Sequence, residues 1–234
     1  NVIHLAAQAG VRHSFFYPQS YIKNNIIGTF NILDYFKNKN ITNILLASTS
    51  SVYGKNKNKV IDENSDSNHP SQIYAASKRS TEIIAHAYSD LYNLPIICLR
   101  FFTLYGPWGR PDMALYKFCE NILANKKIEV YNYGNHYRNF TYIDDVSKII
   151  SKLLSKKNLK NKSWYKDYEI SSSYTNFKIL NISSGIKITL KKFIKVIEKN
   201  LNKKSKKNYF QLQKGDVVGN NSSNNRIKKC IKRA

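Results

Sequence analysis

The sequence predicts an α/β protein whose sheet is mainly parallel. Short apolar runs that suit buried strands alternate along its 234 residues with stretches whose apolar side chains recur at helical spacing. Several of these runs end in small or hydroxyl-bearing residues, most clearly at residues 48–51. Because parallel sheets bind ligands at the carboxyl ends of their strands, we expect a functional site where these runs end.

The first half of the chain supplies three of the expected strands. The opening run at 1–7 is apolar and ends in small residues, which predicts a buried strand. The runs at 44–47 and 95–101 predict the second and third strands, and two helices separate the three. The predicted buried positions of these helices follow the spacing of an amphipathic helix. They are Ile22, Ile26, Phe30, Leu33 and Phe36 in the first helix, and Ile84, Ala87, Tyr88 and Leu91 in the second.

The second half of the chain continues the alternation. Its expected elements are a helix at 113–123, a strand at 128–131, a helix at 144–154, a strand at 179–183 and a last helix at 190–197. The residues at 161–176 predict a polar insertion. The basic tail after Gly219 is expected to be poorly packed, because it is polar throughout.

The composition limits the class of protein. The formal charge is +23, but the lysines are scattered among asparagines, which favours a basic solvated surface over a nucleic-acid-binding one. No uncharged apolar run approaches the roughly 20 residues that span a bilayer. Three cysteines without paired spacing, and no signal peptide at the start, favour a soluble cytoplasmic protein. The histidines at 4, 69 and 136 show no metal-type spacing, so no metal site is expected.

Tyr74 and Lys78 are the residues whose spacing points to chemistry. They lie four residues apart on an expected helix and share one of its faces. A phenol with its ordinary pKa of about 10 is a poor base, and a fixed positive charge nearby favours the phenolate. The same spacing is common in helices where it is only packing and solvated surface. The position of this pair after the hydroxyl cluster at 48–51 favours the catalytic interpretation.

Further motifs accompany the pair in a fixed order. They are HLAAQAGVR at 4–12, NIIGT at 25–29, STSSVYG at 48–54, YAASK at 74–78, LRFFTLYGP at 99–107 and FTYIDD at 140–145. With these motifs the chain resembles the NAD-dependent nucleotide-sugar epimerases of the extended short-chain dehydrogenase/reductase family. The run GPWGRPDMA at 106–114 is most similar to the UDP-glucuronate 4-epimerases of that family.

The resemblance implies a Rossmann-type doubly wound parallel sheet, its first strands missing, with a smaller interleaved α/β substrate domain. Residues 1–103 would be the remainder of the NAD-binding domain. Residues 104–142 and 160–234 would form the substrate domain, with Rossmann elements at 143–159 between them. Family members begin with a Gly-rich turn that cradles the pyrophosphate, and these 234 residues contain none. We therefore expect an N-terminally truncated chain that does not hold NAD tightly and is inactive by itself.

The resemblance also implies the catalytic roles. Tyr74 would take the proton of the sugar 4-hydroxyl while the hydride at C4 passes to bound NAD. Lys78 would hold the cofactor ribose and lower the pKa of Tyr74, and Thr49 would hydrogen-bond the reacting hydroxyl. The 4-keto sugar would then turn over and regain the hydride on its other face, which inverts C4. The remaining residues implied in NAD binding are Leu5, Ala6, Ala7, Asn25 and Phe101.

Contacts to the UDP-sugar are implied in both domains. Thr103 would touch the sugar, Arg138 would pair with the diphosphate, and Asp216 would accept a hydrogen bond from the uridine ribose. Tyr131 either stacks on uracil or is a core aromatic residue of a strand. Arg110 either contacts the substrate or is a solvated arginine beside a Pro–Asp turn.

Ser50 and Ser51 separate this chain from two related enzyme classes. The related 4,6-dehydratases carry Asp-Glu at these two positions, and the UDP-glucuronate decarboxylases carry Glu at the second. A hydroxyl cannot replace a carboxyl group in the acid–base steps of elimination. Thr49, Ser50 and Ser51 instead offer neutral donors to a substrate carboxylate, unless the two serines only form a strand-end turn. The sequence therefore favours a UDP-glucuronate 4-epimerase, with a UDP-glucose or N-acetylglucosamine 4-epimerase or an inactive relative as alternatives.

Two positions depart from the family pattern. Asn139 stands where the family usually has Asp, and residues 217–221 replace the usual Pro-Ala-x-x-Ala-Asp run. Family members commonly form homodimers through two helices, which are expected here at 20–36 and 73–91.

Overall fold

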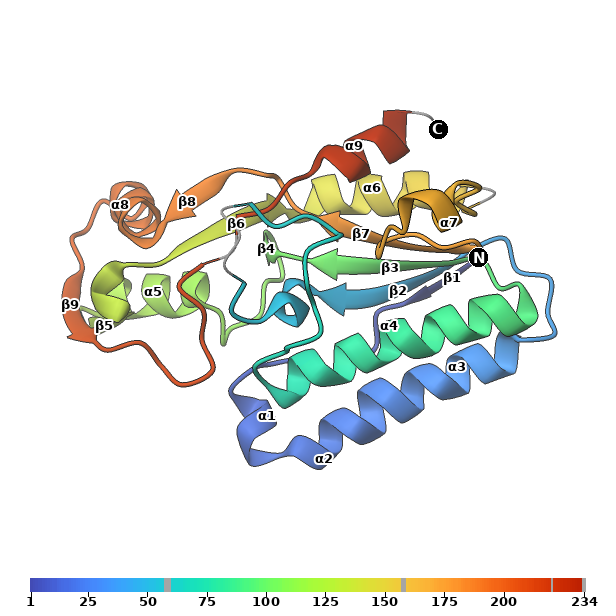
Figure 1. The fold of residues 1–234 in the computed structure, drawn as a ribbon. Coiled ribbons are helices and arrows are strands. Elements are labelled where there is room, and N and C mark those ends of the chain that lie inside the picture. Colours follow the sequence, from blue (N-terminus) through green and yellow to red (C-terminus); the bar gives the residue numbers. More distant parts are fainter. Residues whose placement is uncertain (57–59, 157–158, 220, 233–234) are drawn as a thin grey trace.

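The computed structural model describes residues 1–56, 60–156, 159–219 and 221–232, and a four-stranded parallel sheet forms its centre (Figure 1). The strand order is β1-β2-β3-β7. The strands are β1 (Val2–His4), β2 (Ile44–Thr49), β3 (Ile96–Phe101) and β7 (Phe177–Ile182). The predicted α/β class with a parallel sheet is confirmed.

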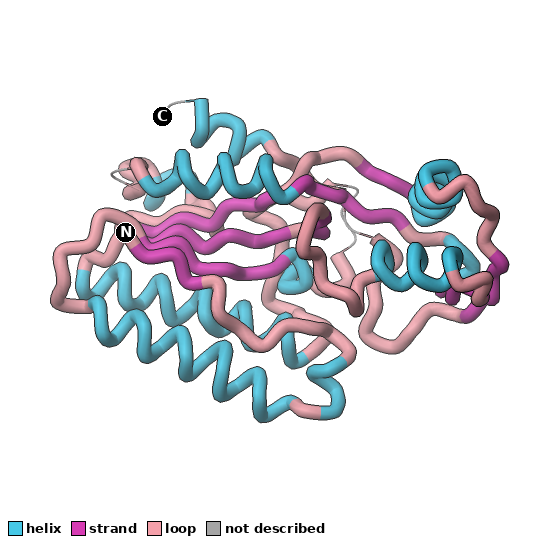
Figure 2. The backbone as a smooth tube through the Cα atoms, turned by 180° about the vertical axis from the view of Figure 1, so that it is seen from behind, coloured by secondary structure: helices cyan, strands magenta, loops and turns pink. Residues whose placement is uncertain are grey.

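Helices cover both faces of this sheet (Figures 1 and 2). One face carries α3 (Gly28–Phe36) and α4 (Ile73–Tyr92), and the other carries α6 (Ile143–Leu154) and α9 (Asn225–Lys232). Successive strand side chains point to opposite faces, so Leu46 packs with Leu33 and Ala85 while Leu45 packs with Val146. Burial on both sides explains why β2 and β3 are continuous apolar runs instead of alternating patterns. No helix of the described ranges is long and apolar enough to cross a membrane.

A smaller lobe lies beyond the carboxyl ends of the main strands (Figure 1). It contains β4 (Thr103–Tyr105), β6 (Tyr137–Tyr142) and β8 (Lys187–Thr189) in one sheet, β5 (Lys127–Tyr131) and β9 (Lys206–Phe210) in another, and the helices α5 (Ala114–Leu123) and α8 (Leu190–Asn200). Phe118, Ile122 and Ile128 pack with Ile194 and Ile197 to form the core of this lobe. The lobe is held together by its own apolar cluster. It can therefore form a wall of a cavity beside the strand ends, which the main sheet alone could not provide.

The helical stretch before β2 is built from three consecutive pieces. These are α2 (Pro18–Tyr21), a π-helical segment (Ile22–Ile27) and α3. The wider π-helical turn shifts the register of the side chains, so Phe30 of the predicted buried stripe is 44% exposed while Leu33 is fully buried. A shorter helix, α1 (His13–Phe16), precedes this stretch.

Two further predictions about buried faces are wrong. The opening run forms β1, but β1 lies at the edge of the described sheet and Ile3 is 43% exposed. The predicted stripe of α4 ends at Leu91, which is 71% exposed. Ile84 and Tyr88 of this stripe do pack against the core, but the buried face of α4 also carries polar residues such as Lys78 and Glu82. The spacing of apolar residues could not predict these polar positions. Their side chains can be buried because hydrogen bonds and opposite charges stabilise them.

Residues 221–232, the part of the basic tail that the structure describes, are packed, contrary to the prediction. Helix α9 places Ile227 against the core of the main sheet, with Cys230 and Ile231 beside it. These three positions follow i, i+3, i+4 spacing, which the many basic residues around them obscured in the sequence.

Residues 177–182 lie inside the range predicted for the substrate domain, yet β7 pairs with β3 in the main sheet. Within the predicted polar insertion, α7 (Trp164–Asp167) stacks Trp164 on Tyr168.

Candidate active site

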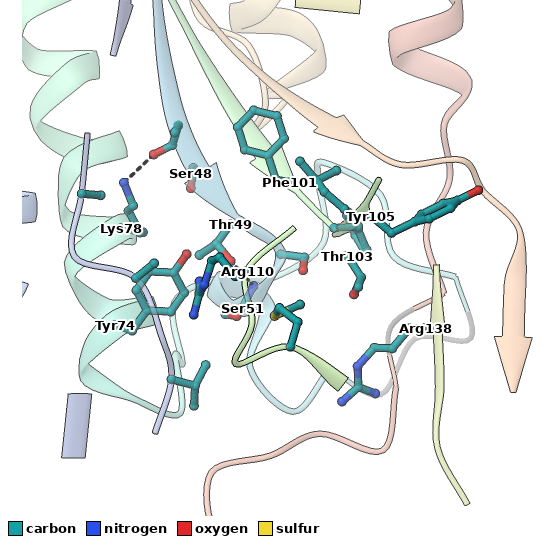
Figure 3. A pocket seen from close by; sticks show the side chains of 18 of the residues that line it. Ser48, Thr49, Ser51, Tyr74, Lys78, Phe101, Thr103, Tyr105, Arg110 and Arg138 are labelled. Carbon is teal, nitrogen blue, oxygen red and sulfur yellow. Dashed lines mark hydrogen bonds between the residues drawn. The ribbon is translucent and has the colours of Figure 1, made fainter. Parts of the chain in front are cut away.

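A cavity of about 640 Å³ lies at the carboxyl ends of β2 and β3, between the main sheet and the smaller lobe (Figure 3). Its size is that of an ordinary small-molecule site. The predicted site residues that line it are Leu5, Ala7, Thr49, Ser50, Ser51, Tyr74, Lys78, Phe101, Thr103, Arg110, Arg138 and Asp216. The fold thus gathers into one cavity residues that are up to 211 positions apart in the sequence, from Leu5 to Asp216.

Tyr74 lies in the first turn of α4 and faces Thr49 at the end of β2 (Figure 3). Burial raises the pKa of the Tyr74 phenol, while its hydrogen bond with Thr49 and the positive charge of Arg110 oppose that rise. The Tyr74 ring also meets the fully buried ring of Tyr21 edge-on, at 6.0 Å between centroids. These contacts fix the phenolic oxygen at the wall of the cavity.

Lys78 lies one helical turn after Tyr74 and is 4% exposed. Its Nζ donates a hydrogen bond of 2.7 Å to the carbonyl oxygen of Ala47, and burial lowers the pKa of Lys78 to about 8. An ammonium group has three donors, so donors remain for a ligand in the cavity that Lys78 lines. In this geometry the cation that acts on the pKa of Tyr74 is Arg110.

A buried ion pair joins α4 to β3 next to the cavity. The Arg100 guanidinium donates to both carboxylate oxygens of Glu82, at 2.8 and 2.7 Å, and both side chains are fully buried. Ser48 donates to the same carboxylate at 2.6 Å. Burial acts to raise the pKa of Glu82, but the charge and hydrogen bonds of Arg100 outweigh it, so the pKa is lowered. The pair ties α4 to β2 and β3 directly behind the site.

The hydroxyl cluster follows β2 as a short 3₁₀ helix (Ser50–Tyr53). The Thr49 hydroxyl accepts a hydrogen bond of 3.2 Å from the backbone N–H of Ser51 and so caps this turn. Ser50 and Ser51 both line the cavity. Neutral donors therefore occupy the wall next to Tyr74.

The opposite side of the cavity carries positive charge. Arg138 of β6 lies across the cavity from Tyr74 (Figure 3), and its Nη2 is 3.0 Å from Oδ1 of Asp216. Arg12 and Lys214 also line the cavity. Arg110 lies near Tyr74 instead and is paired with Asp112, to whose Oδ1 its Nε donates at 2.9 Å. This distribution suits a ligand with a negatively charged group at the end of the cavity away from Tyr74.

Three predicted site residues do not line the cavity. Ala6 is exposed on the loop after β1. Asn25 is fully buried and holds that loop, because its amide accepts from the N–H of Gln8 at 2.7 Å and donates to Ser77 at 2.9 Å. Tyr131 stacks on Phe210 and lies beneath the Arg12 guanidinium, which is 5.3 Å from the centre of its ring.

Sequence reasoning missed several residues that line the cavity. Arg12, Gln72 and Gln213 come from three separate loops or helix starts, and no spacing in the sequence links them. Asn139 also lines the cavity, and its Oδ1 accepts from the N–H of Ser222 at 3.0 Å. No group of His, Cys, Asp and Glu within the described ranges is arranged to hold a metal ion.

Comparison with known proteins gives this site a family. The family model described as the NAD dependent epimerase/dehydratase family matches residues 1–170. The chain belongs to this family. Within it, the chain is 49% identical to Protein CapI of Staphylococcus aureus over 217 residues, which cover 92% of the chain and 65% of that protein. It is 40% identical to the probable UDP-glucuronate 4-epimerase of Rhizobium meliloti over 220 residues, or 92% of the chain and 64% of that relative.

Solved structures of this epimerase/dehydratase family share the fold. The crystal structure of UDP-glucuronic acid 4-epimerase from Bacillus cereus in complex with UDP-glucuronic acid and NAD matches with a TM-score of 0.85 and 28% identity. The match covers 99% of the chain and 69% of that structure. The chain spans slightly less than two thirds of the length of the curated relatives named above.

Proposed function

We propose that the protein is an NAD-dependent UDP-sugar 4-epimerase that converts UDP-glucuronate to UDP-galacturonate. The observation that carries this proposal is the meeting of Tyr74, Thr49 and Lys78 in one cavity whose wall carries neutral hydroxyls. The Bacillus cereus relative binds UDP-glucuronic acid and NAD. The match to that structure covers 99% of the chain.

The residues at the ends of β1 and β3 fit the nicotinamide and ribose of NAD. Leu5, Ala7 and Phe101 supply apolar lining, and small side chains allow a planar ring to approach closely. Lys78 has donors left for ribose hydroxyls after its bond to Ala47. When bound, NAD supplies the acceptor and donor for the C4 hydride. Asn25 supports this region indirectly, since it fixes the loop on which the lining residues lie.

Tyr74 acts as the proton acceptor from the sugar 4-hydroxyl and returns the proton in the second half of the reaction. Its phenol is hydrogen-bonded to Thr49, which therefore orients the oxygen and shares the reacting hydroxyl. Burial raises the pKa of Tyr74, so nearby positive charge is required to stabilise the phenolate. Arg110 supplies that charge, and the Lys78 donors that are not bound to Ala47 would hold the cofactor ribose.

The rest of the cavity suits a UDP-uronate. Ser50 and Ser51 offer neutral donors to the carboxylate, and neither position carries the carboxyl group that elimination needs. Thr103 contacts the sugar. Arg110 contacts the sugar as well, because it lies close to Tyr74. At the far end Arg138 holds the diphosphate. Asp216 accepts from the uridine ribose.

The substrate assignment is tested with the protein encoded by the complete reading frame. UDP-glucuronate and UDP-glucose are supplied separately and the C4 epimers are separated by chromatography. We expect faster inversion of the uronate. Faster inversion of UDP-glucose would transfer the assignment to a neutral-hexose epimerase, and no inversion of either sugar would favour an inactive relative. Titration of NAD into the 234-residue chain measures how much cofactor affinity these residues supply.

We also propose that the protein forms a homodimer through α3 and α4. The outer side of these two helices exposes apolar side chains, including Ile83 at 58% and Leu91 at 71%. Their exposure on a face without a partner indicates an interface. Leu91→Glu should convert a dimer to a monomer in light scattering, whereas Glu120→Gln on α5 should not.

We propose a cytoplasmic location, because Cys98, Cys119 and Cys230 are all free.

A further inference from the structure

Residues 213–217, here called the strap, run along the cavity after β9. Gln213, Lys214, Asp216 and Val217 all line the cavity. The strap therefore forms part of the wall at the positively charged end. Its contacts reach both the smaller lobe and the main lobe, so the strap bridges the two sides of the cavity.

On the side of the smaller lobe, the strap is held by Arg138. This side chain pairs with Asp216 at 3.0 Å and donates to the carbonyl oxygen of Val218 at 3.1 Å. Asp216 also accepts from the N–H of Val217 at 2.8 Å. Arg138 of β6 thus fixes Asp216 and the residue that follows the strap, Val218.

On the side of the main lobe, three residues hold the strap. Gln72 Nε2 donates to the carbonyl oxygen of Gly215 at 2.9 Å, and Arg12 donates to the side-chain oxygen of Gln213. Phe15 packs against Gly215, whose φ is +76°. A Cβ at Gly215 would lie 2.6 Å from Cζ of Phe15, so only glycine permits this approach. The strap is closed against the main lobe at this point.

Gln72 is an unusual residue for its place in the fold. It is the N-cap residue of α4, with φ −150° and ψ 158°, and its side chain makes no capping hydrogen bond. N-cap positions favour short side chains such as Ser or Asp, which bond to their own helix. The longer Gln72 side chain instead crosses to the strap. Among the described residues its Oε1 is buried without a partner, so Gly215 is its one fixed contact.

We propose that Gln72 is a positioning residue that latches the strap over the nucleotide end of the cavity. It links the start of the helix that carries Tyr74 to the strap that carries Asp216. Tyr74 is two residues after Gln72, and Asp216 directly follows Gly215. The ligand class is a nucleoside diphosphate, and in this respect the proposal rests on the proposed function. Loss of the latch lets the strap open, which raises the dissociation rate of the nucleotide without changing the catalytic groups.

The test uses Gln72→Met in the 234-residue chain, with UDP as the probe in calorimetric titration. Methionine keeps the length of the side chain but has no donor, and no helix cap is lost. One neutral hydrogen bond corresponds to a change in affinity of about threefold to tenfold, and we expect UDP binding to weaken by that factor. Gln211→Met is the matched control, since Gln211 is exposed and lies outside the strap. It should bind UDP like the wild type.

Hydrogen exchange provides a readout that needs no ligand. The N–H of Asp216 donates to the carbonyl oxygen of Gln213 at 3.2 Å within the strap. Gln72→Met should speed exchange of this amide, and Gln211→Met should not. In the complete enzyme, Gln72→Met should raise KM for the UDP-sugar and leave kcat within about twofold.

The outcomes separate the two proposals. Unchanged exchange and unchanged UDP affinity in Gln72→Met would overturn the latch. If UDP fails to bind the wild-type chain and the complete protein, the proposed function is wrong, while the exchange rates still decide whether Gln72 holds the strap. A fall in kcat at constant KM would also refute the latch, because it would place Gln72 in the chemical step.

Discussion

The buried charge of Lys78 should lower the free energy of unfolding of the protein. Replacement of Lys78 by methionine tests this directly. The side chain is 4% exposed, and burial lowers its pKa from an ordinary value of 10.5 to about 8. At about 1.4 kcal/mol per pKa unit, keeping this lysine charged at pH 7 costs about 3 kcal/mol. Lys78→Met also removes the hydrogen bond to Ala47, which is a loss of about 1 kcal/mol. The variant should therefore be about 2 kcal/mol more stable than the wild type at pH 7.

The pH dependence of this gain has a definite sign. Because the pKa of Lys78 is lower in the folded state than in the unfolded state, the folded protein binds fewer protons between about pH 8 and pH 10.5. The wild type therefore gains stability relative to Lys78→Met as the pH rises through this window. The advantage of the variant should shrink from about 2 kcal/mol at pH 7 to about zero at pH 9.5.

Urea denaturation followed by circular dichroism at both pH values measures this difference. Lys152→Met, at an exposed position of α6, is the control and should change stability by less than about 0.5 kcal/mol at either pH. Equal stability of Lys78→Met and the wild type at pH 7, or a gain that does not depend on pH, would refute the reasoning. If the gain is found, the lysine is retained for its chemistry at a cost in stability.

Three further substitutions follow from the structure. Glu82→Gln leaves the fully buried Arg100 without its counterion and should destabilise the fold by about 3–5 kcal/mol in urea denaturation, while Glu120→Gln on the surface should not. Ile227→Ala should cost about 2–4 kcal/mol, because Ile227 is 2% exposed in the core; a change below 0.5 kcal/mol would show that α9 does not pack. Arg138→Met should weaken UDP binding by about tenfold or more in calorimetry, and an unchanged affinity would remove Arg138 from the diphosphate site.

The meeting of Thr49 and Tyr74 at one cavity was predictable from the geometry of parallel sheets. Thr49 follows one predicted strand, Tyr74 begins the helix after it, and parallel strand ends meet at one edge. Predicting that these residues meet required only the correct order of helices and strands along the chain. Phe101 and Thr103 were expected at this site from the resemblance to the epimerases, and both line the cavity because β3 is the neighbour of β2.

The supporting residues were not predictable from patterns of the sequence. Glu82 and Arg100 are charged, so an analysis of apolar spacing assigns them to the surface, yet their mutual pairing makes full burial possible. Gln72 and Arg12 reach the strap from loops more than 140 positions away, and no local rule links them to it. Asn25 belongs to a predicted motif, but its role is to hold the loop after β1, which only its contacts show.

The most direct test of the central claim is the rate of C4 inversion in Tyr74→Phe of the complete protein. Phenylalanine keeps the ring that packs against Tyr21 and removes only the phenolic oxygen. Loss of a general acid–base group lowers a rate by roughly 100-fold to 10,000-fold, and we expect a fall in that range with UDP affinity within about twofold. Inversion at the wild-type rate would show that Tyr74 does not move the proton of the sugar 4-hydroxyl.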